Sequence, residues 1–272
     1  MLNDDLHTIN AHLKALRFLT MWRCCTAALA LMLVACAQPL PLPESQSEAA
    51  AAPVNKKAGP LAWVTVEAGV PSQWRHQSFP GKRISDYRTV LHEGRPAMQA
   101  KADSAASMLR QTLYVPAAEL RQLHFSWKAP ALISQADMAQ RDADDSPVRV
   151  VLVFEGDRSK FSMKNAMLSE LAQTMTGEPM PYATLMYVWC NTRAPGSVII
   201  NPRTDRIRKL VLESGEDRLN QWIDYRRDIA ADFEAAFGEA PGALLGVGIM
   251  TDSDNTRSKA QAWYGPVTLT KR

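Results

Sequence analysis

Two carboxylates and an amide stand close together near the C-terminus, directly after the apolar run 244–250. They are Asp252, Asp254 and Asn255. Oxygen donors at this spacing can bind Ca²⁺, contact a polar ligand, or close a turn by accepting nearby backbone N–H groups. The polar turn is the simplest interpretation. Because neighbouring carboxylates repel each other unless a cation or N–H donors offset them, we expect Arg227 to be their protein partner.

A second acidic residue precedes another apolar run. Asp145 comes just before 148–154. We expect it at the same end of the domain as Asp252, Asp254 and Asn255, which we call the acidic turn. With Arg149 and Arg227 it could form either a structural ion-pair network or a polar ligand site. Asp145 and Asp252 could also serve as the carboxylate pair of a hydrolase or lyase that acts on an envelope polysaccharide.

Tryptophan side chains offer a second kind of chemistry, because aromatic faces stack on sugar rings. Trp74 and Trp263 lie in polar, loop-like surroundings and are the candidates for ligand contact. Trp127 and Trp189 lie in apolar strand-like runs, so we expect them in the core.

The N-terminal part of the chain has the pattern of a bacterial signal peptide. An apolar stretch ends on Leu33-Val34-Ala35-Cys36, which resembles a lipobox. We expect a leader over residues 1–36, in which 1–20 are an over-extended start, and a lipidated Cys36. The residue that follows the cysteine is alanine, which by resemblance to bacterial lipoproteins favours the outer membrane, facing the periplasm.

Composition divides the rest into two parts. Residues 37–60 are rich in proline, serine and alanine and predict a flexible linker, and residues 61–272 are long enough for one domain. The net charge of +3, with no polybasic block, argues against nucleic acid as a partner. Only Cys190 remains in the body, which excludes an internal disulfide. No cofactor is expected except Ca²⁺ at Asp252 and Asp254.

The hydrophobic pattern predicts a mainly β protein. Many short alternating runs favour an antiparallel, jelly-roll-like β-sandwich with helical insertions at 162–175 and 224–237. In the second helix an apolar stripe recurs every four residues, with Asp224 as its N-cap. The stripe consists of Tyr225, Ile229, Phe233 and Phe237.

Several motifs along residues 61–272 together resemble a known family, the bacterial domain of unknown function DUF3047. They are 144–150, 181–189, 214–215, Trp222, 226–229, 232–233, 237–241, 246–256 and 264–265. The family implies no established activity. Its pattern is distantly similar to the galactose-binding-like jelly rolls of carbohydrate-binding modules, a likeness of fold.

Together these features favour a lipid-anchored periplasmic protein whose β-sandwich binds a saccharide or another cell-envelope polymer without catalysis. Two alternatives stay open at the level of sequence. One is the acidic-residue hydrolase or lyase, which would need a deep acidic pocket. The other is an envelope scaffold that docks on another protein, which would need a flat apolar patch.

Overall fold

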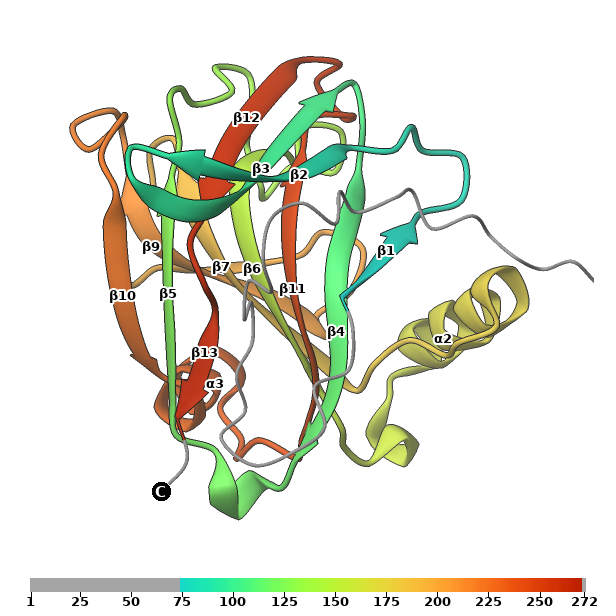
Figure 1. The fold of residues 1–272 in the computed structure, drawn as a ribbon. Coiled ribbons are helices and arrows are strands. Elements are labelled where there is room, and N and C mark those ends of the chain that lie inside the picture. The colour runs from blue at the N-terminus through green and yellow to red at the C-terminus, as the bar shows by residue number, and fades with distance from the viewer. Residues whose placement is uncertain (1–73, 271–272) are drawn as a thin grey trace, which may run out of the picture. The chain divides into compact units, whose positions relative to one another are not determined.

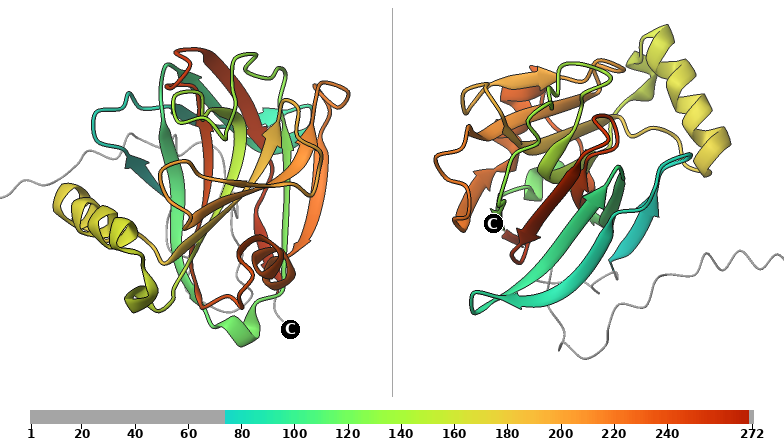
Figure 2. Two further views of the ribbon diagram at one scale, coloured as in Figure 1. Left: turned by 180° about the vertical axis from the view of Figure 1, so that it is seen from behind. Right: turned by 90° about the horizontal axis from the view of Figure 1, so that it is seen from above.

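Two β-sheets pack face to face around an apolar core (Figures 1 and 2). The computed structural model describes residues 74–270; the predicted leader, Cys36 and the linker lie outside them. The predicted β-sandwich with helical insertions is confirmed.

The larger sheet has seven strands. In spatial order they are β1 (Arg75–Ser78), β4 (Ser107–Val115), β11 (Leu244–Asp252), β6 (Ser146–Phe154), β7 (Ala183–Cys190), β9 (Ile207–Ser214) and β8 (Val198–Ile200). Neighbouring strands are antiparallel except β7 and β9, which are parallel. The parallel pair arises because the chain reverses at the edge strand β8 before β9 enters between β8 and β7.

The smaller sheet has six strands. Its order is β10 (Ile223–Asp228), β5 (Gln122–Lys128), β12 (Lys259–Tyr264), β3 (Arg95–Asp103) and β2 (Asp86–His92), and β13 (Thr268–Thr270) pairs with β5 as well. Residues 265–267 separate β12 from β13. Pro266 stands in the break, where its missing N–H group removes a ladder hydrogen bond.

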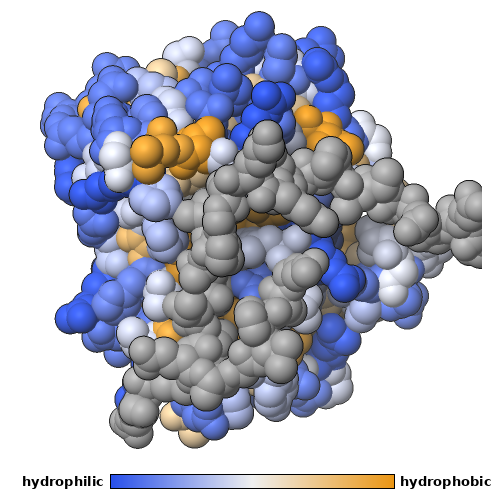
Figure 3. Space-filling view, viewed as in Figure 1, coloured by the Kyte–Doolittle hydropathy of each residue, from blue (hydrophilic) through white to orange (hydrophobic). Residues whose placement is uncertain are grey.

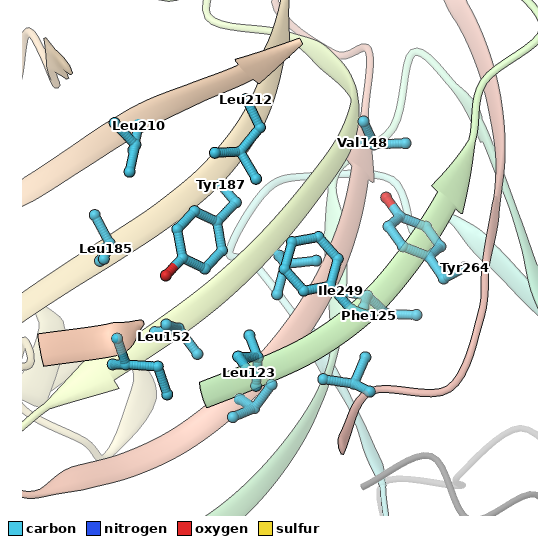
Figure 4. Close-up of a cluster of buried hydrophobic side chains, with 14 of the residues drawn as sticks. Leu123, Phe125, Val148, Leu152, Leu185, Tyr187, Leu210, Leu212, Ile249 and Tyr264 are labelled. Carbon is cyan, nitrogen blue, oxygen red and sulfur yellow. The ribbon is translucent and has the colours of Figure 1, made fainter. Parts of the chain in front are cut away.

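The core lies between the inner faces of the two sheets (Figure 4). Alternate residues of β6 point into it, since side chains on a strand alternate between the two faces. Trp127 and Trp189 are buried there, as the sequence predicts. Among the other core residues are Leu123, Phe125, Val148, Leu152, Leu185, Tyr187, Leu210, Leu212, Ile249 and Tyr264.

A smaller apolar cluster lies on the other side of the seven-stranded sheet. The connection between β5 and β6, residues 129–145, brings Met138 against Val188, Cys190, Ile199 and Val211. Cys190 is a free, buried thiol within this cluster. This long connection therefore covers part of the outer face of the sheet.

The helix α2 (Met163–Thr176) matches the prediction for 162–175. The Ser162 side chain caps its first turn by accepting the N–H of Asn165, and Gly177 ends it in the left-handed conformation, with φ of 77°. Two short 3₁₀ helices, η1 (Ala117–Glu119) and η2 (Arg158–Lys160), lie in connections. Within residues 74–270, none of the helices has the length and apolar character required to cross a bilayer.

The prediction of a helix over 224–237 is wrong in its first part. Residues Ile223–Asp228 form β10, and the helix α3 (Ile229–Phe237) begins after them. Asp228 caps the helix in place of Asp224, since its side chain accepts the N–H of Ala231 at 3.0 Å. Tyr225 is held in the strand by pairing with Phe125, on which its ring stacks.

Phe233 should be a large contributor to stability, because it is fully buried, stacks on Phe237 and packs at an angle against Phe154. Phe233→Ala should lower the free energy of unfolding by about 3–5 kcal/mol, measured by urea denaturation. Met167→Ala, at an exposed position of α2, is the matched control and should change stability little. A loss below about 1 kcal/mol for Phe233→Ala would contradict its place in the core.

Candidate functional site

Asp252 lies at the end of β11 and is 3% exposed. Its Oδ1 atom accepts hydrogen bonds from Arg149 Nε at 2.9 Å and from the backbone N–H of Ser146 at 3.1 Å. Burial raises the pKa of Asp252 to about 7, although the nearby guanidinium favours the ionised form. The partner of Asp252 is therefore Arg149, on the neighbouring strand β6.

Arg149 has a second carboxylate partner. It is 2% exposed, and its Nη2 atom donates to Asp144 Oδ1 at 3.1 Å. Lys209, completely buried on β9, places its Nζ atom 2.6 Å from the other oxygen of Asp144. Burial opposes ionisation of Asp144, but Arg149 and Lys209 outweigh it and lower its pKa. Burial and Arg149 lower the pKa of Lys209 to about 8. We call Arg149, Asp144, Asp252 and Lys209 the buried ion network.

Asp145, just before β6, holds the acidic turn after β11 in place through hydrogen bonds. Asp145, 1% exposed, accepts the backbone N–H of Asn255 at 3.2 Å and that of Thr256 at 2.7 Å. Asp254 forms an ion pair with Lys82. The structure thus brings Asp145 and the acidic turn together at one end of the sandwich, with backbone N–H groups and a lysine as their partners.

This cluster contains the oxygen donors expected for Ca²⁺. One carboxylate oxygen from each of Asp145, Asp252 and Asp254 lies within 4.8 Å of the others. Ca²⁺ needs about 6–8 oxygen ligands, however, and here the carboxylates already receive N–H groups or cationic side chains. A metal ion would have to compete with Arg149 and Lys82. The arrangement favours a structural role, and Ca²⁺ binding stays a prediction.

The expectation that Arg227 joins the acidic turn is wrong. Arg227 is the last residue but one of β10, and its Nε atom donates to Asp232 of α3 at 2.9 Å. The helix packs at the far end of β6, where Phe233 contacts Phe154, whereas Asp252 pairs with the first residue of β6. Because the helix begins at residue 229, Arg227 stays in a strand beside the first turn of α3, and the contacts of α3 and of Asp252 with β6 place Arg227 at the opposite end of the sandwich from Asp252.

The two candidate tryptophans differ from the prediction in their surroundings. Trp263 lies in the strand β12, not in a loop, and is 8% exposed. It faces the outer side of the six-stranded sheet, because its neighbour Tyr264 points into the core. Trp74 precedes β1, is half-buried and packs against the main core.

Trp263 belongs to a group of rings on this outer side, which we call the aromatic cluster: His92, Trp222 and Trp263. The rings of His92 and Trp263 stack in parallel at 3.9 Å between centroids, and Trp222 lies 6.1 Å from His92. The guanidinium of Arg95 lies over the Trp222 ring at 5.5 Å. Among the described residues, neither indole N–H of the cluster nor Nε2 of His92 has a hydrogen-bond partner.

Two grooves lie on the outer side of the six-stranded sheet, which we call the polar face, and the rings of the aromatic cluster line neither of them. One has a volume of about 300 Å³ and lies beside the ion pair of Arg95 and Asp224. The other, of about 520 Å³, lies along β2, β3 and β12. It is lined mainly by charged and amide side chains, among them Arg83, Asp86, Lys101, Asp103, Lys259 and Gln261.

Hydrophilic residues dominate the described surface in Figure 3, with small hydrophobic areas among them. The polar face thus combines hydrogen-bonding side chains with aromatic rings. His92 and Arg95 are not among the site residues predicted from the sequence. The signal that could have found the face is the alternation in β12, where Lys259, Gln261 and Trp263 share one side.

A β-sandwich with an aromatic cluster on the outer side of one sheet is thus the class of domain defined by the fold. The chain belongs to the family described as a protein of unknown function, DUF3047, whose model matches residues 72–268. No curated protein matches the chain.

A solved structure similar to this chain is the xyloglucanase domain of NopAA, a type three effector from Sinorhizobium fredii, in complex with cellobiose. The match covers 73% of this chain and 98% of that chain, with 9% sequence identity and a TM-score of 0.30. This likeness is too weak to carry an argument about function.

The raised pKa of Asp252 predicts a pH dependence of stability. The folded state holds the proton on the Asp252 carboxyl more tightly than the unfolded state does. Protonated Asp252 therefore contributes to the free energy of unfolding below about pH 4, and this contribution is lost as pH rises towards 7. Relative to the Asp252→Asn variant, the original protein should lose on the order of 4 kcal/mol of unfolding free energy across this range.

Urea denaturation from pH 4 to pH 8 measures this difference. Asp217→Asn, at an exposed position, is the matched control and should follow the original curve. A difference between the original protein and Asp252→Asn that stays constant with pH would contradict the raised pKa.

Proposed function

We propose that the domain binds a saccharide or a similar hydroxyl-rich cell-envelope polymer on its polar face, without catalysis. The observation that carries the proposal is the aromatic cluster on the outer side of the six-stranded sheet, where the partly exposed Trp222 lies beside His92 and under the guanidinium of Arg95.

The chemistry around the cluster supports a hydroxyl-rich ligand. Sugar rings present apolar C–H faces that stack on aromatic rings and hydroxyl groups that both donate and accept hydrogen bonds. Trp222 is partly exposed, and the exposed ion pair of Arg95 and Asp224 offers both donors and acceptors beside it. The two grooves are shallow and charged side chains take part in lining both of them, which agrees with binding along a chain.

The geometry does not favour the competing hydrolase or lyase. A general acid or base must come within hydrogen-bond reach of the substrate. Asp145 and Asp252 are 1% and 3% exposed, and their oxygens are engaged by Thr256, Asn255, Arg149 and Ser146. A role in structure fits these two carboxylates better than a role in catalysis.

The location is a second part of the proposal. The run Leu33-Val34-Ala35-Cys36 supports lipid modification of Cys36 and attachment to the outer membrane on its periplasmic side. Acyl chains would hold the protein at the membrane, since each buried CH₂ group contributes about 0.8 kcal/mol. The Pro- and Ala-rich residues 37–60 would then give the domain reach towards a polymer of the envelope.

The binding role is tested on a glycan array with the Trp222→Ala and Arg95→Ala variants. Each should weaken binding of the selected saccharide by about tenfold or more, because each removes part of the stacking and hydrogen-bonding surface. Tyr114→Ala is the matched control, since Tyr114 is an exposed aromatic residue on β4, away from the polar face. Unchanged binding in both variants would reject the polar face as the site.

Lipid attachment is tested by membrane fractionation of the Cys36→Ser variant. It should be released from the outer membrane into the soluble periplasmic fraction, because the thiol that accepts the lipid is gone. A variant that still fractionates with the outer membrane would show that the lipobox interpretation is wrong.

A further inference from the structure

The helix α2 turns its apolar side to solvent. Met163, Met167, Leu171 and Met175 are 82%, 65%, 54% and 56% exposed. They follow one another at intervals of four residues, so they form one stripe along a helix about 21 Å long. We call these four residues the α2 stripe. In Figures 1 and 2 the helix stands at the side of the sandwich.

Polar contacts fix this orientation. Asn165, which is buried on the opposite side of the helix, donates to Asp205 at 2.6 Å and accepts from Thr204 at 2.8 Å. Ser169, one turn later, is buried as well. Rotating the helix to bury its apolar side would break these hydrogen bonds and leave polar groups without partners. The α2 stripe is therefore held outward by the fold.

The size of the α2 stripe limits what can cover it. A stable protein interface buries roughly 800 Å² on each partner, which four side chains cannot supply. A second copy of the chain is thus a poor occupant. A weak apolar contact is sufficient only where another attachment already holds the two surfaces close together.

We infer that the α2 stripe rests on the surface of the phospholipid bilayer to which Cys36 is attached. This inference depends on the proposed lipid anchor. The predicted linker, residues 37–60, has 24 residues, and a flexible chain of that length would span about 27 Å on average. The anchor would keep the domain next to the bilayer, where a short stripe of Met and Leu side chains inserts at the interface.

The test uses the full lipid-modified chain in vesicles of phosphatidylethanolamine and phosphatidylglycerol. A Met167→Cys variant carries an environment-sensitive fluorophore; Cys190 is buried and should not react. Ile200→Cys, on the edge strand β8 and 51% exposed, is the matched control. The label at position 167 should show a blue shift and be quenched by bilayer-resident quenchers, and the label at position 200 should show neither.

The other outcomes overturn the inference and separate it from the anchor. If the protein floats with the vesicles but the label at position 167 stays in water, the anchor is supported and the docking of α2 is wrong. If the protein does not float, the anchor fails and the inference fails with it. If the label at 167 is shielded without vesicles, in proportion to protein concentration, a second copy covers the α2 stripe.

Discussion

Arg149 is a buried cation on a central strand, and the surrounding structure is arranged around it. A buried charge without a partner costs several kcal/mol, so each carboxylate that reaches it becomes fixed in place. Asp252 fixes the end of β11, and Asp144 fixes the connection 129–145 over the seven-stranded sheet. Lys209 balances the second oxygen of Asp144. The acidic residues at this end of the sandwich are thereby used to hold strands and a long connection together.

Because these carboxylates are buried and paired, we expect a ligand site on another face of the domain. The inner faces of both sheets are apolar and fill the core, and part of the outer face of the seven-stranded sheet is covered by the smaller apolar cluster. The polar face carries the aromatic cluster and the two grooves. The α2 stripe lies on a separate element, so a polymer on the polar face and a bilayer under α2 would involve different parts of the domain.

The sequence predicts much of the framework, because strands with apolar alternation and a helix with clear caps carry local signals. Ser162 and Gly177 define α2 in this way. The start of α3 could not be chosen locally, because Asp224 and Asp228 are both good N-cap residues. The choice depends on the pairing of Tyr225 with Phe125, a contact between distant parts of the chain.

The site shows the same division. The sequence identifies Asp252 as a charged residue at a strand end, but it cannot tell whether Arg149 or Arg227 is the partner, since that depends on strand order. The strand β3 has a weak sequence pattern, because its inward residues Ala100 and Ala102 are small and weakly hydrophobic. Without β3 and β2, His92 could not be placed beside Trp263, nor Arg95 beside Trp222.

Saccharide binding on the polar face can be observed by a ¹H–¹⁵N NMR titration of the protein with the saccharide that a glycan array selects. Tryptophan indole N–H groups give separate signals, so the ligand's position can be observed directly. We predict that the indole signals of Trp222 and Trp263 move on binding while those of Trp127 and Trp189, in the core, stay in place. If the backbone signals of Asn255 and Thr256 move while the indole signals of Trp222 and Trp263 stay unchanged, the saccharide does not bind on the polar face. The binding site would then be at the acidic turn.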